Sequence, residues 1–304
     1  MEERKLDFEK NKVEVLTLDE LKQTYMEVTP NGTPTFGYHH YECLEKILIE
    51  LEKVCKPHVS EIFAANNGDS RYPGVSVIRD LVPQMGEGSL GVHTLRRVYS
   101  NIETGVGIDN GITLNVAFSY NQRGIQIGVG PHVHVCHNQS ILGAQYLFST
   151  YSICGAIHKE QSYKSFDEVF GAFSKFVENF QSEFKNIIDE YESLKKQQYD
   201  MNAVLAFFGY LLRHRVMFDT KEKNYKTSEI YPLSGVQLNM AMERFCIYDA
   251  ENKPQALSGW DLINLLNTDM KPERADIPSL MSHMIRLVYS LNNFKRAYYG
   301  TESV

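Results

Sequence analysis

The segment Gly124-Ile-Gln-Ile-Gly-Val-Gly-Pro-His-Val-His-Val-Cys-His-Asn138 combines strand-forming residues, a Gly-Pro pair and a cluster of histidines. Alternating apolar residues on both sides of the Gly-Pro pair predict two strands, with the pairing interrupted between them. Because successive side chains of a strand point to opposite faces, His132, His134 and Cys136 would share one face of the second strand. The segment therefore predicts the middle of a β-sheet and raises the question of a metal site.

A metal site needs more than this strand supplies. Two histidines two residues apart can bind one zinc ion, but a tetrahedral site takes further ligands from elsewhere. The remaining histidines are scattered and form no second cluster at ligand spacing. The favoured interpretation is a structural, half-buried strand, with no cofactor and no catalytic residue assigned. A metal-dependent hydrolase built on His132, His134 and a carboxylate such as Asp109 is kept as the second alternative.

The neighbouring sequence extends the sheet. Short β-favourable runs occupy 75–78, 91–95 and 112–120 and are separated by glycine-bearing loops. Residues 121–124 predict a hairpin turn. The glycines of 105–111 lack the Gly-Lys-Ser/Thr ending of a phosphate loop, so this stretch is interpreted as a flexible connection. An antiparallel meander of about five strands within 70–160 is the simplest arrangement.

Helical patterns flank the sheet. Residues 1–60 are predicted to be helical, with a capping box at Thr17–Glu20 and an amphipathic helix over 38–55. A second capping box, Ser165–Glu168, opens an apolar repeat at spacings of three and four that could continue for about thirty residues, or ~45 Å. A helix of this length suggests an arm or an intermolecular seam.

The fold class that follows is α+β, with a central antiparallel β-sheet between helical segments. We divide the chain into an N-terminal helical segment (1–60), a sheet core (61–160), a long helix and helical hairpin forming an arm (161–228), and a C-terminal helical segment (229–304). In the last segment, Leu257-Ser-Gly-Trp-Asp261 is interpreted as a helix start in which Trp260 anchors the packing.

Composition limits the class of protein. The chain has 304 residues, 43% of them hydrophobic, and a formal net charge of −7. The five cysteines show no regular spacing, which is typical of reduced thiols in the cytoplasm. No apolar run approaches the ~20 residues that span a bilayer, and the start of the chain does not have the pattern of a signal peptide. A soluble cytoplasmic protein with no membrane association is expected.

Nucleic-acid binding is the first alternative function. An exposed sheet surface with aromatic and basic side chains could stack on bases and hold a single strand, as in phage recombination and annealing proteins. The net charge and the absence of a continuous basic groove argue against it. The candidate residues are Arg96, Arg97, Tyr99, Phe118, Tyr120 and Arg123.

The two strands that meet at Gly130-Pro131, followed by Cys136-His-Asn138, resemble the centre of a family of phage and plasmid proteins described as a domain of unknown function. The later run 257–266 resembles the C-terminal part of the same proteins. Asn138-Gln139 stands where that family usually has Asn-Gly. The resemblance implies an origin on a mobile genetic element and implies no catalytic residues.

The favoured function is therefore non-enzymatic. The acidic balance, the aromatic richness and the long amphipathic helix suggest a phage or mobile-element protein that binds and inhibits a host macromolecular complex. A counter-defence inhibitor is one form of this hypothesis, and a nuclease–helicase system of the Gabija type is one candidate target. A homo-oligomer is also expected, because the apolar stripe of the arm needs burial. The candidate interface residues are Phe173, Phe180, Phe184, Tyr298 and Tyr299.

Overall fold

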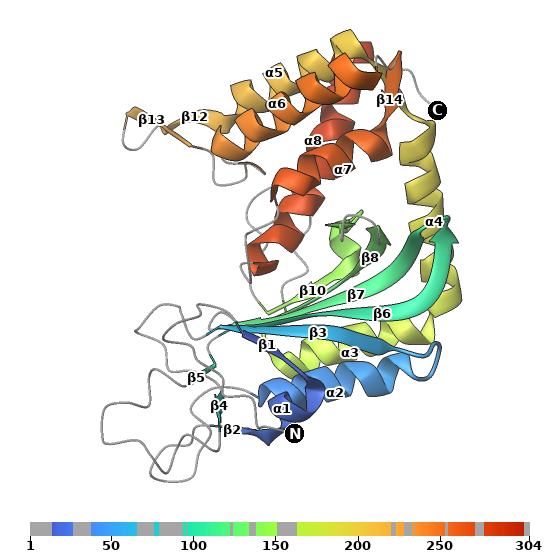
Figure 1. Ribbon diagram of the computed structural model, residues 1–304, viewed down its shortest axis with the longest axis vertical. Helices are drawn as coiled ribbons and strands as arrows, with labels where there is room; N and C mark the ends of the chain where they lie inside the picture. The colour runs from blue at the N-terminus through green and yellow to red at the C-terminus, as the bar shows by residue number, and fades with distance from the viewer. Residues whose placement is uncertain are drawn as a thin grey trace.

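The protein is arranged as a twisted β-sheet with helices beneath it and a second group of helices above it (Figure 1). The computed structural model describes residues 14–26, 38–65, 76–78, 94–95, 97–121, 124–133, 138–150, 163–219, 223–227, 233, 235–252, 255–270 and 277–300. Within these ranges no helix is both long and apolar enough to cross a membrane.

The central sheet confirms the predicted fold class. Its strands follow the order β1-β3-β6-β7-β8-β10, β9 pairs with β8, and each described pair is antiparallel. The sheet has more strands than the five or so predicted, and β1 and the first residues of β3 come from the segment that we expected to be helical. Two of the predicted runs do not belong to it: residues 76–78 and 94–95 form a separate three-stranded sheet with residues 24–26. The strands are β1 (Glu14–Leu16), β3 (His58–Ala65), β6 (Arg97–Asp109), β7 (Ile112–Asn121), β8 (Gly124–Val133), β9 (Asn138–Gln139) and β10 (Leu147–Ser149).

Strand β8 runs straight through the Gly-Pro pair, so the predicted interruption is wrong. Pro131 pairs in register with Leu114 of β7, and its carbonyl accepts a hydrogen bond of 2.8 Å from the backbone N–H of Ser140. Gly130 lies directly beneath this crossing segment. A Cβ at Gly130 would lie 1.8 Å from the carbonyl oxygen of Ser140. The glycine therefore allows two backbones to approach closely, which is a known role of strand glycines.

The interpretation of 105–111 as a flexible connection is also wrong. Strand β6 continues to Asp109, and the turn into β7 is the two-residue pair Asn110-Gly111. Gly111 has a φ of 71°, in the left-handed region that glycine adopts without strain. Shifts of register between Glu103 and Val106 and between Gly107 and Asp109 bend the hairpin. The hairpin turn predicted at 121–124 is confirmed by the pairing of Asn121 with Gly124.

The lower face of the sheet is apolar and carries two helices, α2 (His40–Leu51) and α3 (Phe166–Glu178). The ring of Tyr120 lies 4.7 Å from that of His40 in α2 and 5.1 Å from that of Phe166 at the start of α3. Phe148 of β10 packs edge-on against Phe173, with ring centroids 5.7 Å apart. The predicted apolar stripe is confirmed within α2, where Cys43, Leu44, Ile47 and Leu51 are buried, but the helix ends at Leu51 and Val54 is exposed.

The predicted thirty-residue helix is interrupted at Asn179. Helix α3 ends there and α4 (Phe180–Lys196) begins, and Asn179 has a non-helical φ of −102° and ψ of 19°. Its side-chain amide donates a 2.8 Å hydrogen bond to the carbonyl of Lys175, as asparagine does at helix ends. In Figure 1, α3 lies under the sheet while α4 rises along its edge to the upper helices. The apolar stripe is thus covered within the chain.

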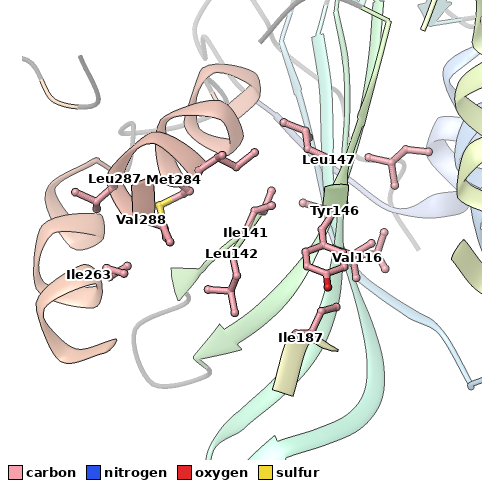
Figure 2. Close-up of a cluster of buried hydrophobic side chains, with 14 of the residues drawn as sticks. Val116, Ile141, Leu142, Tyr146, Leu147, Ile187, Ile263, Met284, Leu287 and Val288 are labelled. Atoms are coloured by element: carbon pink, nitrogen blue, oxygen red, sulfur yellow. The ribbon is translucent and has the colours of Figure 1, made fainter. Parts of the chain in front are cut away.

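The upper helices are α5 (Met201–Arg215), α6 (Gly235–Asn252), α7 (Gly259–Met270) and α8 (Ile277–Tyr299). Figure 2 shows Met284 and Val288 of α8 facing Ile141 and Leu142, which follow β9. Trp260 is buried, with its ring edge-on to Tyr191 at 4.8 Å, in agreement with its predicted role.

Short elements complete the described structure. They are helix α1 (Leu18–Gln23), the 3₁₀ turn η3 (Ala144–Tyr146), strands β2 (Thr24–Met26), β4 (Ser76–Ile78) and β5 (Thr94–Leu95), the pair β11 (Gln198–Asp200) and β14 (Ala256–Ser258), and the hairpin β12 (Val216–Asp219) and β13 (Asn224–Thr227). The β11–β14 pair joins the end of α4 to the start of α7.

Candidate protein-binding surface

Helix α6 has apolar side chains on two opposite sides. Leu238, Ala241 and Phe245 are buried and recur at spacings of three and four, so they form the side that packs on the protein. Val236 and Ile247, which lie on the other side of the helix, are 69% and 60% exposed. Solvent therefore reaches large aliphatic side chains on a well-formed helix. The exposed apolar residues of α6 are Val236, Met240, Met242, Ile247 and Tyr248.

The neighbouring helix α5 also carries exposed apolar side chains. Phe208 of α5 packs against Phe245 of α6 with ring centroids 5.7 Å apart, which holds the two helices side by side. Leu205 and Leu212 of α5, one heptad apart, are exposed. Gly209 lies between them, and a Cβ there would meet nothing within 4 Å. We call the exposed apolar residues of α5 and α6 the α5–α6 surface.

Charged side chains lie at the ends of the α5–α6 surface and also within it. Arg213 and His214 are exposed in the last turn of α5, and the guanidinium of Arg215 approaches Gly235 at the start of α6. On α6, Glu243 and Arg244 are exposed in the middle of the helix, and Glu251 is exposed near its end. The exposed apolar side chains are therefore interspersed with charged ones, and basic residues gather at the C-terminal end of α5.

The predicted interface residues lie in two different environments. Phe173 and Phe180 are buried inside the chain, and Phe184 is partly buried and stacks on Phe180 at 5.8 Å. These phenylalanines serve the core, so their assignment to an intermolecular contact is wrong for Phe173 and Phe180. Tyr298 and Tyr299 at the end of α8 are about half exposed, at 45% and 48%.

The aromatic surface expected for nucleic acid is not formed. Phe118 and Tyr120 are fully buried on the helix-covered face of the sheet. Tyr99 pairs with Ser119, which alternates with Phe118 and Tyr120, so Tyr99 points to the opposite face. Arg96 and Arg123 lie outside the described residues, as does the side chain of Arg97. The three aromatic residues therefore cannot act together as a stacking surface.

The structure does not assemble the candidate metal ligands into a site among the residues that it describes. His132 is buried in β8, where it pairs with Thr113 of β7, and His134 lies outside the described residues. Asp109 is engaged elsewhere: its Oδ2 accepts hydrogen bonds from Lys195 Nζ at 2.6 Å and from Tyr191 Oη at 2.9 Å. Within the described residues, His, Cys, Asp and Glu form no group of three that could hold a metal ion.

The Asp109 contacts tie the tip of the β6–β7 hairpin to α4. The hydrogen bond from Lys195, followed by those from the Asn110 backbone and Tyr191, lowers the pKa of Asp109 to about 2. Burial and the contact with Asp109 raise the pKa of Tyr191 to about 12. This cluster is a structural joint between the sheet and α4.

The joint predicts a pH-dependent stability. Because the pKa of Asp109 is lowered in the folded state to about 2, its contribution is present above the unfolded value of about 4 and disappears as the pH falls toward 2. We expect Asp109→Asn to be less stable than the wild type at pH 7 and equally stable near pH 2, as measured by urea unfolding. Asp189→Asn, which removes an exposed carboxylate of α4, is the control. A difference that does not change with pH would contradict the assignment.

Sequence reasoning missed the outward side of α6. The segment was predicted to lead into a helix, but a helix with apolar residues on several sides shows no clear periodicity that separates inside from outside. One signal in the sequence could have indicated the exposed apolar side. Val236, Met240 and Ile247 are apolar residues beyond those that α6 needs to pack on the protein. No protein-family model, curated protein or solved structure matches this chain. The resemblance to phage and plasmid proteins stays a prediction.

Proposed function

We propose that this protein acts by binding another protein through the α5–α6 surface. The observation that carries the proposal is the exposure of Val236, Met240 and Ile247 along the outer side of α6. Single exposed aliphatic side chains are common, but several of them on one side of a folded helix favour an interaction site. Two packed helices present this patch, so its geometry is fixed before a partner arrives.

The partner that fits is a protein with a complementary apolar face. Leu205 and Leu212, with Gly209 between them, leave room for a side chain or helix of the partner to approach α5 closely. Acidic groups on the partner would complement Arg213 at one end of the surface, and basic groups would complement Glu243 in the middle of α6 and Glu251 near its end. Charge complementarity of this kind sets orientation and association rate, while the apolar side chains supply affinity.

The wider biological role follows from the sequence predictions and is part of the same proposal. A protein of a mobile element that docks on a host complex would inhibit it by occupying one of its surfaces. The apolar patch supports docking as the mode of action. The identity of the complex is for the experiment to find.

Charged substitutions on α6 test the proposal. We expect Val236→Glu with Ile247→Glu to weaken partner binding by about 2 kcal/mol or more, roughly thirtyfold, because a charge would be buried at the contact. Folding should be little affected, since both side chains point to solvent. The measurement is quantitative affinity capture from a bacterial lysate, followed by determination of the Kd with the purified partner.

The matched control is Lys185→Glu, an exposed position on α4 that changes the net charge by the same two units. A partner retained by the wild type and the control but lost by the double variant supports the proposal. Equal capture by all three proteins contradicts it. Light scattering on the purified chain provides the other decisive outcome: a dimer that the double variant dissociates would show that a second copy, rather than a foreign protein, occupies the surface.

A further inference from the structure

A cleft of about 300 Å³ lies where the sheet, α4 and α8 meet. Its apolar floor consists of Leu142, Leu194 and Val288, all of which are buried. Leu142 and Val288 come from the segment after β9 and from α8, and Figure 2 shows them on facing sides of the junction. The volume is at the lower end of the range for ligand sites, so the cleft fits a small ligand or a single side chain.

The rim of the cleft is polar and carries one charge. Gln145, Ser193, Gln197 and Asn292 are neutral, and no Lys, Arg or His is among the described residues that line it. Glu190 supplies the charge. Its carboxylate accepts one hydrogen bond of 3.1 Å, from Gln145 Nε2, and forms no ion pair within the described residues. Glu190 is partly buried, and this burial raises the pKa of its carboxyl group.

The end of helix α4 adds to the negative potential. Ser193 and Leu194 lie in its last turn, and Gln197 is the C-cap residue. Backbone carbonyls at a helix C-terminus carry a partial negative charge, which favours a cation nearby. The basic residues of this turn are Lys195 and Lys196, neither of which lines the cleft, and Lys195 is bound to Asp109.

We propose that this cleft binds an alkylammonium group. The ammonium would lie against the carboxylate of Glu190, with the hydroxyl of Ser193 and the amide oxygen of Asn292 as further acceptors. The alkyl stem would cover Leu142, Leu194 and Val288. An ammonium has three donors and no acceptor, so a rim with a carboxylate and several neutral acceptors satisfies it. The ligand would also join the sheet to α4 and α8.

Two sources supply this group, a free aliphatic diamine and the side chain of a lysine. We would titrate the full-length protein with cadaverine and, separately, with a lysine blocked at both ends, and follow binding by calorimetry at pH 7.5 and low salt. Saturable binding of either ligand is the expected result, and the preferred ligand identifies the source. Pentan-1-ol, which has the same apolar stem without the charge, should not bind.

Glu190→Gln keeps the shape of the side chain and its contact with Gln145 but removes the charge. We expect it to raise the Kd at least about tenfold, because a charge-assisted contact is lost. Glu192→Gln, which removes a carboxylate of α4 outside the cleft, should leave the Kd unchanged. The wild-type affinity should also fall between pH 7.5 and pH 5, as the carboxylate of Glu190 begins to protonate. Failure of both ligands to saturate by about 10 mM, or equal Kd values for the wild type and Glu190→Gln, overturns the proposal.

Discussion

Replacing Phe173 by alanine should lower the free energy of unfolding by about 3–5 kcal/mol, the usual cost of removing a buried aromatic side chain. Phe173 is fully buried, and its ring lies 5.7 Å from Phe148 of β10 and 6.2 Å from Phe176. The substitution would leave a cavity between α3 and the sheet. Surrounding rings can fill it only in part, because they are themselves held by neighbours in the same cluster. Urea unfolding followed by circular dichroism measures the change.

Phe184→Ala is the matched comparison on the following helix. Phe184 is only partly buried and stacks on one ring, that of Phe180, so we expect a loss of about 1 kcal/mol. The comparison distinguishes a phenylalanine stripe that packs in the protein core from one that contacts another molecule. If Phe173→Ala unfolded like the wild type but lost a binding partner, the stripe would be an intermolecular contact after all.

The predicted arm shows what helical periodicity can and cannot give. Spacings of three and four identified the buried side of 166–194 correctly, because that pattern follows from helix geometry alone. The same pattern cannot say whether the side meets the protein's own sheet or another molecule. It also continues across Asn179, where the chain turns. In the structure, other parts of the chain bury Phe173 and Phe180. The apolar stripe therefore no longer requires a second copy of the chain to cover it.

The sheet was predictable for a similar reason and with a similar limit. Alternation in 112–120 and 124–128 predicted antiparallel strands, which the structure has as β7 and the first part of β8. The upper face of these strands carries the polar residues Asn115, Ser119, Gln126 and His132, which are nevertheless buried. A polar set on alternate positions normally indicates a solvated face. Here later segments of the chain cover this face. The pattern of a single strand gives no information about such coverage.

The candidate binding surface was the least predictable part. On α6, buried and exposed positions both carry aliphatic side chains, so composition gives no sign of which side is outside. Leu238, Ala241 and Phe245 become the inner side because Phe208 of α5 meets Phe245. This is a tertiary contact between residues far apart in the sequence. A surface defined by what remains uncovered can be recognised only once the covering elements are known.

Substituting Gly130 by alanine should destabilise the protein by about 3 kcal/mol. A Cβ at this position would meet the carbonyl oxygen of Ser140 at 1.8 Å and its carbonyl carbon at 2.9 Å, both of which belong to the backbone. The crossing segment would have to move, which weakens the hydrogen bond from Ser140 N–H to the Pro131 carbonyl. Overpacking costs about 1–3 kcal/mol, and a lost hydrogen bond adds about 1 kcal/mol.

Gly107→Ala is the control, because Gly107 is also a strand glycine but a Cβ there would meet nothing within 4 Å. We expect that variant to be unchanged or slightly stabilised, since alanine reduces the entropy of the unfolded chain. The two substitutions add the same methyl group to neighbouring regions of one sheet, so a difference between them reports the crossing at Ser140 alone. Equal stability of both variants would show that Ser140 does not pack over Gly130, and that β9 does not extend the pairing of β8 as described.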